Sequence, residues 1–170
     1  NDMIAVMRWN SPLREFMMSA GLYLAKAAGE IRLVSNDSHQ QPELDYHLLD
    51  HPYDLERMRA GVRMQIELGK HSAYKGILKE VKDPLPEDLE SDETLDKWLL
   101  SRAQTMHHIS CTARMGAADD PMAVTNQYGQ VHGIEGLRIA DLSIMPDCPR
   151  ANTNSPAMMI GERIADFMSR

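Results

Sequence analysis

Three side chains in the last third of this chain have the chemistry needed to move a proton at an oxygen atom. His107 and His108 are adjacent in the segment 105–116, and Asn152 lies in the segment 151–156. An imidazole has an unperturbed pKa of about 6.5, so much of it is neutral at pH 7 and can accept a proton. A carboxamide can hydrogen-bond the same oxygen without competing for that proton. These residue types fit a general base with an orienting partner.

A structural role is the alternative for each of these histidines, because a single histidine beside an apolar strand is more often packed and hydrogen-bonded than catalytic. His132 is expected to serve the fold. The remaining histidines lack the spacing of a metal site, and the two cysteines form no Cys-x-x-Cys motif. We therefore expect no metal ion, and Cys111 and Cys148 are expected to be reduced thiols.

Hydrophobic periodicity predicts the elements that must position these residues. Apolar residues three and four positions apart indicate a helix over 11–28, which Ser11 and Pro12 would start. Alternating apolar residues indicate half-buried strands, and capping residues before apolar stripes indicate further helices. The strands are expected over 30–35 and 43–48, and the helices over about 50–68 and 91–103.

The final helix is the best specified element. Ser155 is suited to the N-cap and Pro156 to the first helical position. Apolar residues then give the helix one hydrophobic side as far as residue 168. A helix N-terminus carries unpaired backbone N–H groups and partial positive charge, so this end is suited to an anionic partner.

Composition narrows the class of protein. The chain has 170 residues, 43% of them apolar, and a formal net charge of −7, which argues against a nucleic-acid surface. No apolar run approaches the roughly 18 residues of a membrane span. A soluble protein is expected, with the cytoplasm slightly favoured and the location otherwise open. The start at Asn1 rather than methionine suggests a processed, split or truncated product.

Four sequence blocks, in order, resemble the C-terminal region of the glucose–methanol–choline (GMC) oxidoreductase family. The second block contains His108 and ends in Arg114-Met115-Gly116, and the third contains Val131-His132-Gly133. The blocks lie at 29–44, 108–116, 131–146 and 152–163.

The resemblance implies an α+β fold, the C-terminal portion of a GMC flavoenzyme. Residues 1–128 would form the substrate-binding portion, an antiparallel sheet with flanking helices and the catalytic histidine loop at its end. Residues 129–170 would return to the FAD-binding α/β domain and complete it with a strand near 137–139 and the terminal helix. The Gly-x-Gly-x-x-Gly fingerprint that cradles the FAD pyrophosphate is absent from this chain. The expected partner is a second polypeptide segment that carries that N-terminal half.

The resemblance also implies an activity, the oxidation of a primary alcohol to an aldehyde by an FAD-dependent enzyme. His108 would remove the hydroxyl proton while hydride passes to flavin N5, and Asn152 would orient the substrate oxygen. A plain turn role remains open for Asp141, and a structural role for His107. The residues expected to contact FAD are His107, Ala140, Asp141, Asn154, Ser155 and Pro156.

The same residues are compatible with two other functions. A hydroxynitrile lyase of the same family would keep the flavin without using its redox chemistry, and a non-catalytic fragment would keep only the fold. The particular alcohol, and the choice between an oxidase and a dehydrogenase, are not determined by these residues.

Overall fold

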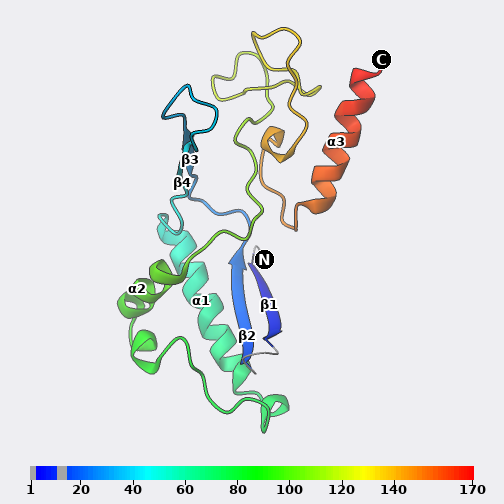
Figure 1. Cartoon of the computed structure of the whole chain (residues 1–170). Helices are drawn as coiled ribbons and strands as arrows, with labels where there is room; N and C mark the ends of the chain where they lie inside the picture. The colour runs from blue at the N-terminus through cyan, green and yellow to red at the C-terminus, as the bar shows by residue number, and fades with distance from the viewer. Residues whose placement is uncertain (1–2, 11–14) are drawn as a thin grey trace. The chain divides into compact units, whose positions relative to one another are not determined.

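The computed structural model describes residues 3–10 and 15–170, with side chains described from Phe16 onward. The chain divides into two compact units, the first made of residues 1–29 and 44–104 and the second of residues 30–43 and 105–170 (Figure 1). Both contain helix together with short strands or bridged extended segments, which confirms the mixed α+β class. The predicted division at residue 128 concerns the complete enzyme and stays a prediction.

The first unit begins with a β-hairpin rather than the predicted helix. Strand β1 (Met3–Asn10) pairs antiparallel with β2 (Glu15–Leu22), with Met3 opposite Leu22. The helix prediction over 11–28 is therefore wrong across β2, and residues 11–14 lie outside the described residues. Burial alternates along β2: Phe16 and Met18 are half-buried, and Met17 is exposed. The apolar residues of this segment fit both the helical period of about 3.6 residues and the strand period of 2. Pairing with β1 makes the segment a strand.

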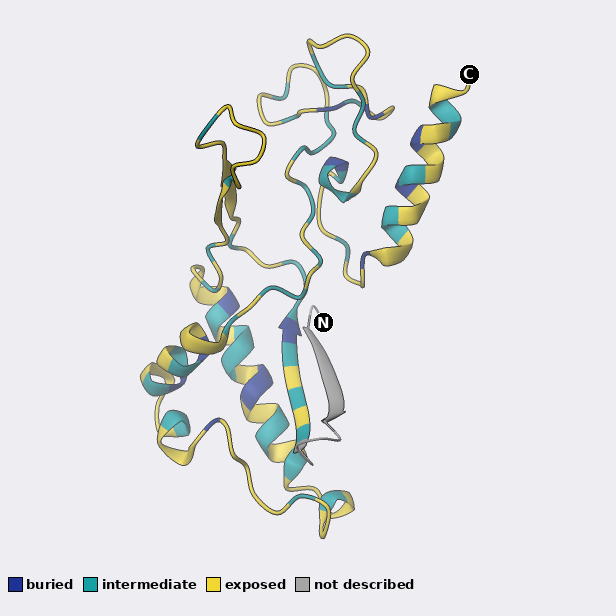
Figure 2. Ribbon diagram, in the orientation of Figure 1, coloured by how far each residue is buried: buried dark blue, intermediate teal, exposed yellow. Residues whose placement is uncertain are grey.

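Two helices complete this unit, and both match their predictions. Helix α1 (Pro52–Gly69) packs along the hairpin, and α2 (Asp92–Arg102) packs on α1 (Figure 1). The imidazole of His51 caps α1, and the Ser91 hydroxyl caps α2 by accepting from the N–H of Thr94. Their shared core is formed by Val62, Leu95 and Leu99. Figure 2 shows buried positions in dark blue on both helices. Short 3-10 turns lie at Ser72–Tyr74 and Pro86–Leu89.

A second two-stranded sheet pairs β3 (Glu30–Arg32) with β4 (Glu43–Asp45). Both strands were predicted, but they are shorter than the alternation indicated. Their side chains are also exposed, so the expectation of half-buried strands is wrong for this chain (Figure 2).

The second unit is organised around the terminal helix α3 (Asn154–Met168) and the 3-10 turn η3 (Leu142–Ile144). Ile144, Ile160 and Ile164 are buried between them and form a second core. The N-cap of α3 is Thr153, so the prediction of Ser155 as cap is wrong by two residues. Pro156 still falls in the first turn, where a missing N–H removes no intrahelical bond.

The strand predicted near residues 137–139 is not present in the described second unit. Instead, Gln130 and Arg138 form a single antiparallel bridge, and the Ile139 N–H donates to the Gly129 carbonyl at 2.9 Å. Gly129, Gly133 and Gly136 all have positive φ. Regular strands need negative φ throughout, so the chain turns at these glycines and the hydrogen bonding stays limited to isolated bridges.

Among the described helices, none is long and apolar enough to cross a bilayer.

Candidate active site

The segment that carries His108 is fixed along the turn η3. Its alternate backbone N–H groups donate to successive carbonyls of the turn: Cys111 to Leu142 at 3.2 Å, Ala113 to Ser143 at 2.9 Å and Met115 to Ile144 at 2.8 Å. The Met115 side chain packs against the second core. Because the same core holds α3, the histidine segment and the helix start share one rigid support.

His108 is half-buried and contacts the first residues of α3. Its Nδ1 atom lies 2.9 Å from the Oγ1 atom of Thr153. Thr153 is only 4% exposed, and it directly follows Asn152, which is exposed. The structure therefore brings the predicted base to the segment that carries its predicted partner. Thr153 was missed in the sequence, because a threonine before a helix is typical of an ordinary N-cap.

His107 differs sharply from its neighbour. It is exposed, and its φ of 63° places it in the left-handed region that few non-glycine residues adopt. Its N–H donates to the Thr105 hydroxyl at 3.0 Å. The structure thus turns the backbone between the two histidines, and the expected contact of His107 with FAD stays a prediction.

Asp141 caps the turn that supports the histidine segment. Its Oδ1 atom accepts from the Ser143 N–H at 2.8 Å, at the N-cap of η3. This is the turn role that the sequence left open beside a cofactor role. A contact of Ala140 and Asp141 with FAD remains a prediction.

The start of α3 has the properties that suit an anionic group. Asn154 and Ser155 are exposed, and N–H groups in the first turn of a helix have no intrahelical acceptor. The helix has 15 residues, long enough for its dipole to add partial positive charge at this end. The expected contact of Asn154, Ser155 and Pro156 with FAD stays a prediction.

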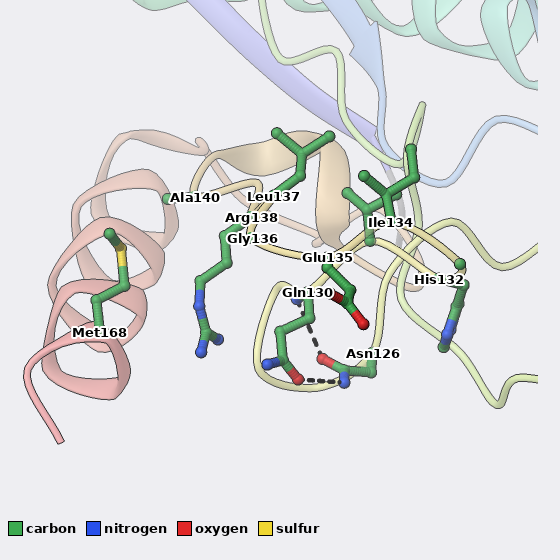
Figure 3. A pocket seen from close by; sticks show the side chains of 12 residues that line it. Asn126, Gln130, His132, Ile134, Glu135, Gly136, Leu137, Arg138, Ala140 and Met168 are labelled. Carbon is green, nitrogen blue, oxygen red and sulfur yellow. Dashed lines mark hydrogen bonds between the residues drawn. The ribbon is translucent and has the colours of Figure 1, made fainter.

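A cavity of about 640 Å³ lies in the second unit (Figure 3). Figure 3 shows Asn126 and Gln130 hydrogen-bonded at its edge, and Ala140 is among the residues that line it. Neither His108 nor Asn152 lines this cavity. It is therefore separate from the contact between His108 and Thr153.

Two free thiols meet beside the histidine segment. The Sγ atoms of Cys111 and Cys148 are 3.8 Å apart, and the Ser110 hydroxyl is 3.1 Å from the Cys148 sulfur. Burial is the largest cause that raises the pKa of the Cys111 thiol to about 11; Cys148 and Asp147 contribute to the rise, and the Ser110 hydrogen bond opposes it. Their separation in the sequence gave no sign of this contact. Among the described residues, no cluster of three metal-binding side chains occurs.

Comparison with known proteins places this arrangement in a family. Residues 25–161 match the model of the GMC oxidoreductases. An oxygen-dependent choline dehydrogenase of Stenotrophomonas maltophilia (strain R551-3) is 37% identical, over 90% of this chain and 27% of its own. A 5-(hydroxymethyl)furfural oxidase of Methylovorus sp. (strain MP688) is 38% identical, over 82% of this chain and 28% of its own.

A solved structure has the same fold over most of this chain. A variant of the formate oxidase of Aspergillus oryzae RIB40 superposes with a TM-score of 0.82 at 30% identity, over 91% of this chain and 27% of that chain. The chain belongs to the GMC oxidoreductase family, whose enzymes are FAD-dependent. It spans about a quarter of the length of the relatives that it matches.

Proposed function

We propose that this chain contributes the proton-transferring part of an FAD-dependent enzyme that oxidises a primary alcohol to an aldehyde. The observation that carries this proposal is the contact of half-buried His108 with Thr153, beside Asn152 at the start of α3. FAD, when bound, accepts the hydride that leaves the hydroxyl-bearing carbon. His108 removes the hydroxyl proton, and Asn152 hydrogen-bonds the same oxygen.

The relatives support the substrate class. Choline and 5-(hydroxymethyl)furfural, which name two of them, each carry a primary hydroxyl group. The formate oxidase likeness supports a second candidate, formate, because a base beside the flavin would serve that oxidation as well. The two substrate classes are separated by supplying each to the oxidised enzyme without oxygen.

The ring geometry of His108 supports its role as the base. Since Nδ1 is held at Thr153, the Nε2 atom is the nitrogen left to meet a substrate proton. Asn152 is a neutral amide, so it can orient an oxygen without changing the proton count. The start of α3 adds positive potential where negative charge develops, which favours hydride transfer electrostatically.

The decisive experiment compares His108→Ala with Asn152→Ala in the FAD-loaded assembly. A general base contributes about 10²–10⁴-fold, so His108→Ala should slow flavin reduction by that order while FAD stays bound. Asn152→Ala removes an orienting hydrogen bond and should cost about tenfold to a few hundredfold. Anaerobic stopped-flow absorbance measures this step without reoxidation.

The adjacent histidine provides the matched control. His107 is exposed and lies next to His108, so His107→Ala should be milder. A collapse of the rate in His107→Ala alone would move the base to that residue. Full-speed reduction in both variants would remove proton abstraction by a histidine from the proposal.

A hydroxynitrile lyase of the same family is the alternative activity. A lyase turns over its substrate with the flavin still oxidised, whereas an alcohol-oxidising enzyme bleaches the flavin in the absence of oxygen. If primary alcohols leave the spectrum unchanged and a cyanohydrin is cleaved, the lyase replaces the oxidation proposed above. A fragment with neither activity would have only a structural role.

A further inference from the structure

The side chain of Thr153 does not perform the usual task of its position. An N-cap threonine ordinarily accepts a hydrogen bond from the N–H of the second or third helical residue. Here the third helical residue is Pro156, which has no N–H, and the Thr153 side chain makes no cap hydrogen bond. Its hydroxyl instead lies 2.9 Å from Nδ1 of His108. The stabilisation of a side-chain cap is therefore replaced by a contact with the predicted base.

We propose that Thr153 is a positioning residue that selects the reactive tautomer of His108. This inference rests on the function proposed above. A neutral imidazole carries one N–H, and only the nitrogen without it can accept a proton. If Oγ1 of Thr153 accepts a hydrogen bond from the Nδ1–H group, the lone pair of the ring is on Nε2. That nitrogen can then accept the proton of a substrate hydroxyl.

The opposite direction of this hydrogen bond is incompatible with catalysis. If the hydroxyl donated to Nδ1, the ring proton would lie on Nε2 and His108 could not act there as a base. After proton transfer both ring nitrogens carry hydrogen, so Nδ1 must then have an acceptor. The accepting role of Thr153 therefore serves the ring before and after the transfer, as a carboxylate does in other histidine pairs.

Burial makes the contact selective. Thr153 is 4% exposed, so water has little access to compete for its hydroxyl. The residue is also bonded directly to Asn152, and its carbonyl accepts from the Ala157 N–H at 2.9 Å. One residue thus connects the imidazole of His108, the backbone of Asn152 and the first turn of α3.

The test uses Thr153→Val, which keeps the shape and removes the hydroxyl, with Thr153→Ser to restore it. In the FAD-loaded assembly, Val should lower the limiting rate of anaerobic flavin reduction by about ten- to a hundredfold, as loss of an orienting partner typically does. The apparent Kd of the alcohol should change little, and Ser should recover most of the rate. Thr112→Val is the control, since that threonine is exposed in the same segment.

A spectroscopic readout separates positioning from packing. In protein labelled with ¹⁵N-histidine, the ring signals of His108, assigned with His108→Gln, should show the Nδ1–H form. Thr153→Val should shift them toward the Nε2–H form or a mixture, and Thr153→Ser should restore them. A slow Val variant with unchanged ring signals, or with no rescue by Ser, would reduce Thr153 to a packing residue and overturn the proposal.

A Val variant with the wild-type rate and ring signals would overturn it as well. Failure of the proposed function looks different. In that case His108→Ala itself reduces flavin at the wild-type rate, while the ring signals still report whether Thr153 holds Nδ1.

Discussion

At the residue scale, tertiary contacts distinguish side chains that are equivalent in the sequence. His107 and His108 are adjacent and chemically identical, yet one is exposed and the other is half-buried against Thr153. The same holds for the two thiols, since Cys148 is exposed and Cys111 is partly covered. The reactivity of the thiols should follow this difference, because burial penalises the charged thiolate form.

Alkylation of the thiols should follow this contrast. The thiolate is the reactive form, and burial raises the pKa of Cys111 to about 11. Iodoacetamide at pH 7.5 should therefore modify Cys148 first, and the Cys111 rate should rise about tenfold per pH unit up to pH near 11. Peptide mass spectrometry over time gives both rates. Cys148→Ser should leave Cys111 slow, since burial is the largest cause of its shift, and equal rates at pH 7.5 would contradict this assignment.

At the element scale, one residue in each unit holds neighbouring segments together: Asp54 in the first unit and Gly129 in the second. Asp54, in the first turn of α1, is fully buried and accepts from the N–H groups of Lys26 and Ala27 at 2.8 and 2.9 Å. Arg57 lies 3.7 Å from the other carboxylate oxygen. This aspartate therefore holds the segment after β2 against α1.

Replacing this buried carboxylate should be costly. Asp54→Ala leaves the N–H groups of Lys26 and Ala27 without their acceptor and removes the carboxylate beside Arg57, so the free energy of unfolding should fall by about 3–5 kcal/mol. Urea denaturation followed by circular dichroism measures it. Glu67→Ala, at an exposed pair with Lys70, is the control and should change stability little. A loss as small as the control's would show that Asp54 is not structurally important.

Gly129 provides the corresponding position in the second unit. Its φ is 70°, and a Cβ there would lie 2.5 Å from the Ile139 carbonyl oxygen and 2.9 Å from Cδ1 of Ile164. Gly133 has a similar φ of 75° but open space around it. Both alanine variants bear the left-handed strain of about 1–2 kcal/mol. Gly129→Ala should lose about 1–3 kcal/mol more because of overpacking, measured by the same denaturation, and equal losses would exclude crowding.

At the scale of the whole molecule, the chain belongs to an FAD-dependent family but carries no Gly-x-Gly-x-x-Gly sequence for the FAD pyrophosphate. It spans about a quarter of the relatives' length. Exposed apolar side chains line the terminal helix, among them Met158, Met159 and Met168. Exposed apolar side chains on a helix are typical of a surface that another polypeptide segment covers.

The chain alone should therefore fail to retain FAD. Mixed with FAD and passed through gel filtration, it should elute without flavin absorbance. Co-expression with a segment that carries the glycine-rich half should restore a yellow complex. Stoichiometric flavin on the chain alone, surviving the column, would show that no second segment is needed for binding.

The sequence by itself determined the three long helices, because caps and apolar periodicity are local properties. Helices α1 and α2 begin within two residues of the predicted starts at about 50 and 91, and α3 begins within two residues of its prediction. The motif blocks also placed the chain in its family before any contact was known. His108 and Asn152 were predicted from those blocks alone.

Only the tertiary structure decided the rest, because the contacts involved join residues far apart in the chain. Pairing with β1 makes residues 15–22 a strand, although their spacing also fits a helix. Left-handed glycines replace the strand expected near 137–139 with single bridges. The packing of η3 and α3 on one core brings Thr153 to Nδ1 of His108 and Cys111 to Cys148. No local sequence pattern predicts these side-chain contacts, because each depends on how separate segments pack their apolar faces together.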